Sequence, residues 1–149
     1  MAKSEKKMTV LFLCTGNACR SQMAEGWARR LKSDVIDAYS AGIAPAGVSS
    51  RTTKVMAEAG VDISGQTSKH PDELTGMDFD YVVTLCDTAR EYCPVFPGPV
   101  KFVHRPFEDP SLVIGTEQEI MTAFRRTRDA IRAFVETLPD GLQRKRPTN

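Results

Sequence analysis

The chain has 149 residues and a formal net charge of +1, because 20 Lys and Arg residues nearly balance 19 Asp and Glu residues. This length can bury a substantial core, so we expect residues 1–149 to form one domain. The near-neutral charge gives no reason to expect nucleic acid or a membrane surface as a partner. No apolar run reaches the ~18 residues of a membrane span, and none is long enough for a secretory signal, so we expect a cytoplasmic protein.

In the first half of the chain, strand and helix patterns alternate. Met8–Leu13 is a short apolar run that is typical of a buried strand. Gln22–Leu31 repeats apolar residues at helical spacing, and Val35–Ser40 again favours a strand. A second helix is predicted to begin after a cap at Ser49 or Ser50 and to run to about Ala59, where Gly60 ends it.

The second half continues this alternation. A short helix is predicted at His70–Leu74, with a proline in its first turn. Phe79–Leu85 is the strongest strand pattern, and Val100–Val103 is another short one. The longest predicted helix is Thr116–Leu138, whose first residue can form a capping box with Glu119.

This alternation predicts an α/β fold with a single four-stranded parallel sheet, flanked by helices on both faces. Ligands of such sheets bind at the carboxyl ends of the strands. Cys14 follows the first predicted strand and Cys86 ends the third, so we expect both thiols at the same edge of the sheet.

The segment from Cys14 to Ser21 carries the strongest chemical signal. A predicted strand ends at a cysteine, five loop residues follow, and Arg20 and Ser21 lead into a predicted helix. Such a loop can turn backbone N–H groups towards an oxyanion, and the helix N-terminus adds partial positive charge. The residues that we expect to bind the oxyanion are Thr15, Gly16, Asn17, Ala18, Cys19 and Arg20.

The side chains of this loop suit a nucleophilic thiolate. Arg20 offers a planar fork of donors that matches a tetrahedral oxyanion, and Asn17 tolerates left-handed backbone angles. The positive environment favours the thiolate form of Cys14, and Ser21 can donate a hydrogen bond to its sulfur. The alternative is an inert, buried cysteine at a strand end. For Cys19, which also lies in the loop, a role in packing alone is as plausible as a role at the anion site.

A second pair of thiols, Cys86 and Cys93, has six residues between its members. If these formed a helix, the sulfurs would lie nearly two turns apart, ~10 Å along its axis. A disulfide needs Cα atoms within ~7 Å, so bridging would require the segment to unwind, as suits a redox switch. The alternative is two unrelated thiols. The spacing of the four cysteines fits zinc poorly, so we expect no bound metal.

Asp109 lies in a proline-bounded loop after the fourth predicted strand. If this loop returns to the anion site, the carboxylate can act as a general acid that protonates a leaving oxygen. Asp109-Pro110 is also an ordinary turn dipeptide, and the local sequence alone favours the turn.

Taken together, these residues resemble the thioredoxin-coupled arsenate reductases built on the low-molecular-weight phosphatase fold. A cysteine and an arginine six positions apart are shared with true phosphatases, whereas the downstream cysteine pair distinguishes the reductases. The matching segments cover most of the chain and are Cys14–Asn17, Cys19–Trp27, Tyr39–Ile43, Val82–Cys86, Cys93-Pro94 and Asp109-Pro110.

The resemblance implies reduction of arsenate to arsenite by a relay of three thiols. Cys14 attacks arsenate while Arg20 holds its oxygens, and Asp109 protonates the departing oxygen. Cys86 then attacks the Cys14 sulfur, arsenite leaves, and Cys93 moves the resulting disulfide to the Cys86–Cys93 pair. Thioredoxin reduces that disulfide, so no metal or organic cofactor is required. We expect the enzyme to be a monomer.

One position departs from the family pattern. Some members bind potassium through side chains that match Asn17, Glu25, Ser40 and an aspartate, and Lys69 stands at the aspartate position. We expect its ammonium group to replace the cation and to pair with Glu25, which makes activity independent of potassium.

Two other functions remain open from the sequence. A phosphatase acting on phosphotyrosine or small phosphoesters needs only Cys14, Arg20 and Asp109, and arsenate and phosphate have nearly the same shape and charge. A sensor that binds an oxyanion or arsenite through its thiols is a non-enzymatic alternative.

Overall fold

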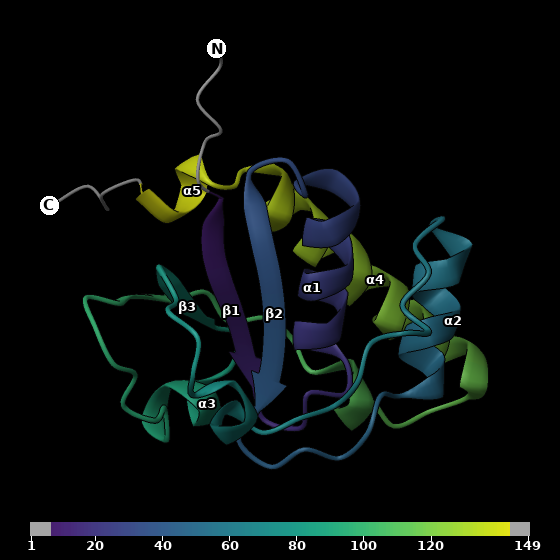
Figure 1. The fold of residues 1–149 in the computed structure, drawn as a ribbon. Helices are drawn as coiled ribbons and strands as arrows, with labels where there is room; N and C mark the ends of the chain where they lie inside the picture. The colour runs from purple at the N-terminus through teal and green to yellow at the C-terminus, as the bar shows by residue number, and fades with distance from the viewer. Residues whose placement is uncertain (1–6, 144–149) are drawn as a thin grey trace, which may run out of the picture.

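Four parallel strands form the sheet of this protein. The computed structural model describes residues 7–143. Its strands are β1 (Met8–Cys14), β2 (Ile36–Gly42), β3 (Tyr81–Thr84) and β4 (Lys101–His104). They lie in the order β2-β1-β3-β4, and each neighbouring pair is parallel (Figure 1). The predicted four-stranded parallel α/β fold is therefore confirmed.

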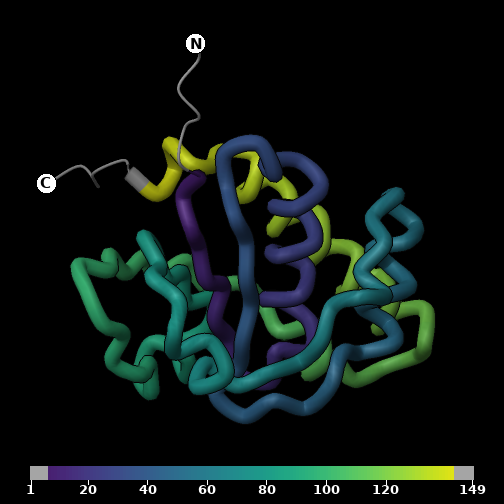
Figure 2. The backbone as a smooth tube through the Cα atoms, in the orientation of Figure 1, coloured from purple at the N-terminus to yellow at the C-terminus, as the bar shows by residue number. Residues whose placement is uncertain are grey.

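Helices and turns connect the strands (Figure 2). The four predicted helices are present as α1 (Arg20–Leu31), α2 (Ser50–Glu58), the 3₁₀ turn η1 (Pro71–Leu74) and α4 (Glu117–Glu136). The predicted capping box between Thr116 and Glu119 is formed at the start of α4. Three further short elements are α3 (Asp87–Glu91), the 3₁₀ turn η2 (Pro110–Leu112) and α5 (Asp140–Gln143).

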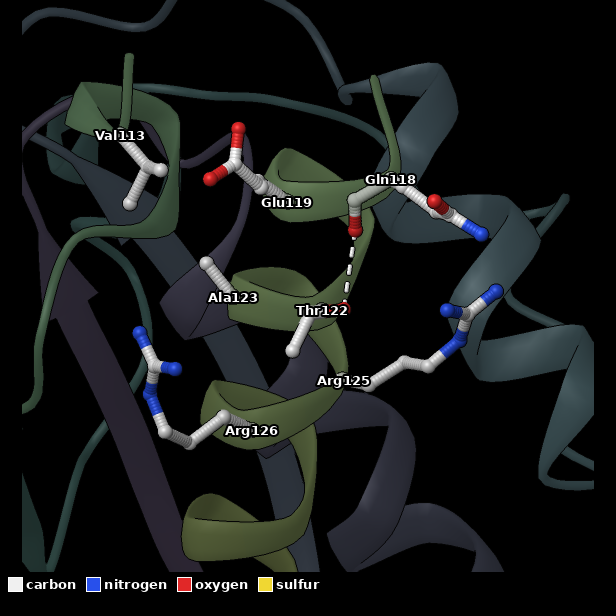
Figure 3. A pocket seen from close by; sticks show the side chains of 7 residues that line it. All are labelled: Val113, Gln118, Glu119, Thr122, Ala123, Arg125 and Arg126. Carbon is white, nitrogen blue, oxygen red and sulfur yellow. Dashed lines mark hydrogen bonds between the residues drawn. The ribbon is translucent and has the colours of Figure 1, made fainter. Parts of the chain in front are cut away.

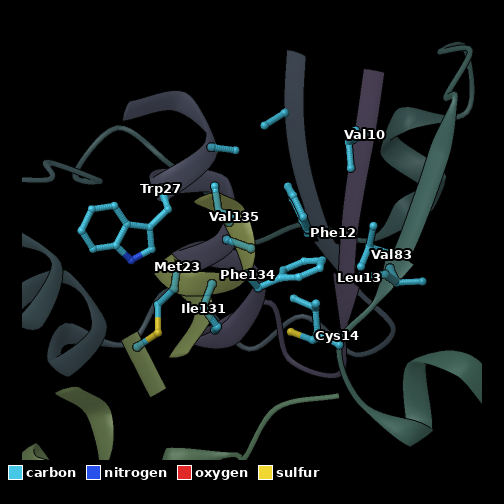
Figure 4. Packing of buried hydrophobic residues seen from close by; sticks show 14 of the residues in the cluster. Val10, Phe12, Leu13, Cys14, Met23, Trp27, Val83, Ile131, Phe134 and Val135 are labelled. Carbon is cyan, nitrogen blue, oxygen red and sulfur yellow. The ribbon is translucent and has the colours of Figure 1, made fainter. Parts of the chain in front are cut away.

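One face of the sheet is covered by long helices. α1 packs on β1 and β2, and α4 packs beside α1. Phe12 of β1 and Phe134 of α4 are both buried in this layer, together with Met23 and Trp27 of α1 (Figure 4). Burial of each such side chain stabilises the fold by roughly 1.5–3 kcal/mol.

The opposite face of the sheet is covered differently from the first. Tyr39 and Phe102 lie in one row across the sheet, and Phe79 and Phe96 link them by ring contacts with centroids 5.8 to 6.3 Å apart. The cover is thus made by loop residues and the short helix α3 rather than by a long helix. Three prolines within residues 94–99 explain this difference, because proline interrupts helices.

Candidate active site

The loop after β1 surrounds a cavity of about 270 Å³ at the carboxyl edge of the sheet. Its carbonyl groups are occupied, because those of Cys14, Thr15 and Gly16 accept bonds from the amides of the segment 43–46. Within the described chain, the amides of residues 15–19 donate no hydrogen bond to the protein, so they are free for an anion. The cavity is lined by Cys14, Thr15, Gly16, Ala18, Cys19, Arg20, Ala44, Ala46, Asp109 and Ser111.

Backbone contacts hold this loop in shape. Asn17 has a φ of 49°, the left-handed conformation that asparagine tolerates. The end of β2 approaches so closely that a Cβ on Gly42 would lie 2.6 Å from the Asn17 nitrogen and 2.6 Å from the Thr15 oxygen. Glycine is therefore required where the second strand supports the loop.

A buried hydrogen-bond network reaches the Cys14 sulfur from below the loop. Ser21 Oγ lies 2.9 Å from Cys14 Sγ, and Asn17 Nδ2 donates to Ser21 Oγ at 2.7 Å and to Ser40 Oγ at 3.0 Å. Ser40 Oγ in turn donates to Glu25 Oε1 at 2.5 Å. The predicted contact between Ser21 and Cys14 is present.

Arg20 and Asp109 meet at the mouth of the cavity. Arg20 Nη2 lies 3.2 Å from Asp109 Oδ2, and its Nη1 donates to the Phe107 carbonyl at 3.2 Å. The other Asp109 oxygen, Oδ1, accepts from the Ser111 amide at 2.9 Å and its hydroxyl at 2.6 Å. Asp109 therefore caps the η2 turn, as the turn interpretation predicts, and also lines the anion cavity. Its role as a general acid stays a prediction.

The structure places the two downstream cysteines, Cys86 and Cys93, in different surroundings. Cys86 Sγ lies 3.2 Å from Thr15 Oγ1, which places the second thiol against the anion loop. Cys93 lies outside that cavity, in a hollow of about 490 Å³ that Phe96 and Phe102 also line. Burial raises the pKa of the Cys93 thiol above its ordinary value. All four cysteines are free thiols.

Cys19 is buried and lines the cavity at the same time. Burial raises the pKa of its thiol, the charges of Asp109 and Cys14 act in the same direction, and Thr52 and Arg20 oppose them. The raised pKa favours the neutral thiol form of Cys19, which is less nucleophilic than a thiolate.

The expected pair between Lys69 and Glu25 is not formed. Lys69 Nζ donates to the Thr67 carbonyl at 2.8 Å, whereas Glu25 Oε2 pairs with Arg29 Nη2 at 2.7 Å. A lysine reaches a nearby carbonyl more easily than a carboxylate already paired within its own helix. Arg29 and Ser111 were not predicted, although Glu25 and Arg29 have the i, i+4 spacing of a helical ion pair.

A hollow of about 510 Å³ along α4 has a different character (Figure 3). Its arginines extend away from each other, Arg125 to Glu58 and Arg126 to Glu108, each at 2.8 to 3.0 Å. Because these side chains are paired and no thiol lines the hollow, it is not the candidate site. Among residues 7–143, no helix is long and apolar enough to cross a membrane, and no group of three His, Cys, Asp or Glu residues is arranged for a metal.

Comparisons with known proteins identify the family of this chain. The family model described as low molecular weight phosphotyrosine protein phosphatase matches residues 9–148. An arsenate reductase from Halalkalibacterium halodurans is 46% identical over 134 residues, 90% of this chain and 96% of that protein. One from Bacillus subtilis is 47% identical over 132 residues, 86% and 95% of the two chains. A solved arsenate reductase in its phosphate-binding state has a TM-score of 0.69 at 33% identity, covering 88% of this chain and 95% of the other. The chain therefore belongs to the low molecular weight phosphotyrosine protein phosphatase family, and within it to the arsenate reductases.

Proposed function

We propose that this protein reduces arsenate to arsenite through Cys14, Cys86 and Cys93, with thioredoxin as the reductant. The observation that carries the proposal is the 3.2 Å contact between Cys86 Sγ and Thr15 Oγ1. It brings the Cys86 sulfur against Thr15, the residue that follows Cys14 in the anion loop. Hydrolysis of a phosphoester needs no such sulfur, whereas reduction of arsenic needs two electrons from a pair of thiols.

The first step replaces an oxygen of arsenate by sulfur. The Cys14 thiolate attacks arsenic while the free amides of residues 15–19 and Arg20 hold the oxygens. Asp109 gives its proton to the departing oxygen, which leaves as water. Arsenic remains pentavalent in the resulting Cys14 adduct.

The next steps move two electrons to arsenic and regenerate the thiols. Cys86 attacks the Cys14 sulfur, and the electron pair of the sulfur–arsenic bond stays on arsenic, which leaves as trivalent arsenite. Cys93 then attacks the Cys86 sulfur of the new disulfide and releases the Cys14 thiolate. Thioredoxin dithiol reduces the Cys86–Cys93 disulfide and is itself oxidised.

The phosphatase alternative is not favoured. The cavity is about 270 Å³ in volume, and none of the described residues that line it is aromatic, so none of them would stack on a phosphotyrosine ring. Inorganic phosphate is expected to enter and to compete with arsenate, because the two anions have nearly the same shape and charge.

The test is arsenate turnover with thioredoxin, thioredoxin reductase and NADPH. We expect wild type to cycle, Cys86→Ser to release no arsenite, and Cys93→Ser to release about one arsenite per enzyme and stop. The control Thr88→Ser alters the exposed surface of the same segment without removing a thiol, and should cycle like wild type. Normal cycling by Cys93→Ser would contradict the relay. Cycling only with glutaredoxin and glutathione, or with a mycothiol system, would contradict thioredoxin as the donor.

A further inference from the structure

Arg29 holds a buried carboxylate that belongs to the network below the anion loop. The Glu25 side chain is 3% exposed, whereas that of Arg29 is 54% exposed. Arg29 Nη2 lies 2.7 Å from Glu25 Oε2 and also donates to the Ala38 carbonyl of β2 at 3.0 Å. Within the described part of the chain, Arg29 is the only cation paired with Glu25. A buried carboxylate without such a partner would be strongly disfavoured as an ion.

The ionised state of Glu25 decides which way the neighbouring hydroxyl groups point. A carboxylate can only accept, so Ser40 must donate its proton to Glu25. Ser40 Oγ then has only lone pairs left for Asn17, whose Nδ2 donates to it at 3.0 Å. The first two bonds of the network therefore have a fixed direction.

The orientation of the Asn17 amide carries this direction to the nucleophile. The Lys69 backbone amide donates to Asn17 Oδ1 at 2.9 Å, which identifies the other end of the side chain as the NH₂ group. That group fills a lone pair of Ser21 Oγ at 2.7 Å. The hydroxyl proton of Ser21 is thus free to point at Cys14 Sγ, 2.9 Å away, where it stabilises a thiolate.

We propose that Arg29 is a positioning residue for the reaction of Cys14. Its guanidinium keeps Glu25 ionised, and the ionised Glu25 fixes the direction of a hydrogen-bond chain that ends with Ser21 donating to the Cys14 sulfur. If Glu25 is protonated, it can donate to Ser40, and Ser21 can accept from a Cys14 thiol instead. The proposal gives a role in the proposed arsenate reduction to a side chain that does not line the anion cavity.

Other charged groups face the two ends of this hydrogen-bond chain, at Glu25 and at Cys14. Asp37 and Tyr39 lie on β2, and burial together with the hydrogen bond to Asp37 raises the pKa of Tyr39, so that its hydroxyl stays neutral. Arg20 and Asp109 line the cavity with Cys14 at the other end. None of these groups is altered in the variants below, so a change can be assigned to Arg29 and Glu25.

The test measures the thiolate of Cys14 directly, by the pH dependence of its alkylation with iodoacetamide, followed on the Cys14 peptide by mass spectrometry. We expect Arg29→Met to move the midpoint upwards by about one pH unit, a tenfold loss of thiolate at a given pH. Arg29→Lys keeps the charge and should restore most of the wild-type profile. Arg30→Met removes the neighbouring exposed cation of the same helix and should change nothing.

A double-variant comparison covers the case in which Arg29→Met leaves a charge unpaired and folds poorly. Glu25→Gln and Glu25→Gln with Arg29→Met both lack the buried ion, and we expect them to share one raised midpoint. A wild-type midpoint in Arg29→Met, or a further shift on adding Arg29→Met to Glu25→Gln, would overturn the proposal. Because the readout uses no arsenate, a failure of the proposed function would leave this result unaffected.

Discussion

The two cysteines of the anion loop, Cys14 and Cys19, have different surroundings. Cys14 and Cys19 both line the cavity, yet only Cys14 lies within hydrogen-bond distance of a serine hydroxyl at 2.9 Å. The pKa of Cys19 is raised, chiefly by burial. The motif predicted the contact between Cys14 and Ser21 correctly, because the two residues lie in one short segment, seven positions apart. It could not separate the two roles open to Cys19, because these depend on what packs around the loop.

Ser21→Ala tests the serine contact by removing the hydroxyl that faces Cys14 Sγ. Hydrogen bonds to charged groups contribute ~1.5–3 kcal/mol, so we expect arsenate turnover to fall at least about tenfold. Steady-state rates at saturating arsenate measure the effect. Ser50→Ala, which removes a hydroxyl at an exposed position, serves as the control. An unchanged rate in Ser21→Ala would mean that Cys14 does not depend on this donor.

The raised pKa of Cys93 predicts how the stability of the protein and the alkylation of this thiol depend on pH. Burial raises it above the ordinary value of 9.0, so the folded protein holds the neutral thiol where the unfolded chain already releases its proton. Stability from this group is therefore lost as pH rises through 9.0 towards the folded value. We expect native Cys93 to be alkylated at higher pH than Cys93 in urea. Coincident pH profiles for the Cys93 peptide in the two states would contradict this.

At the scale of elements, the strands, the long helices and the short turn η1 followed from the sequence, whereas α3, η2 and α5 did not. The apolar spacing of α1 and the capping box of α4 are local signals, and both elements formed where predicted. α3 spans only five residues, Asp87–Glu91, and has too few turns for a periodic pattern. The cover of the second sheet face depends on the aromatic cluster of Phe79, Phe96 and their neighbours, which no local pattern predicts.

The junction of β2 with the anion loop is the element contact most sensitive to substitution. Gly42→Ala would place a Cβ 2.6 Å from backbone atoms of Asn17 and Thr15, which must move apart. We expect a loss of about 1–3 kcal/mol in unfolding free energy and weaker binding of phosphate. Chemical denaturation and phosphate titration measure the two effects. Gly65→Ala is the matched control, because nothing lies within 4 Å of its added Cβ, and equal effects at both glycines would refute the close approach.

At the scale of the whole molecule, ion pairs join α2 to α4 far from the anion site. Glu58 accepts from Arg125 at 2.8 Å through both of its oxygens, and Arg128 Nη1 lies 3.2 Å from its Oε1. The hydrogen bonds from Arg125 lower the pKa of Glu58 from 4.5 to about 2. The sequence gives no sign of this pairing, because the partners are 67 positions apart.

This pairing predicts how acid affects stability. A carboxyl group whose pKa is lowered in the folded state stabilises it above the ordinary value of 4.5, and this stabilisation is lost as pH falls towards about 2. We expect the unfolding free energy of Glu58→Gln to decrease less than that of wild type as the pH falls from 4.5 to 2. Urea unfolding at a series of pH values measures the slope. Glu91→Gln, at an exposed position of α3, is the control, and an equal slope in Glu58→Gln and wild type would contradict the pairing.

The sulfur of Cys86 has one more partner, the Ala89 amide. This contact links formation of a disulfide at Cys86 to the stability of helix α3. Cys86 is the N-cap of α3, and its Sγ accepts a hydrogen bond from the Ala89 amide at 3.4 Å. A sulfur that enters a disulfide becomes a poorer acceptor and must turn towards its new partner, so the cap is lost. A helix of five residues has little stability of its own without its cap. In the proposed relay, oxidation of Cys86 removes this cap. We therefore expect the segment that carries Cys93 to unwind in the same step that forms the disulfide it attacks.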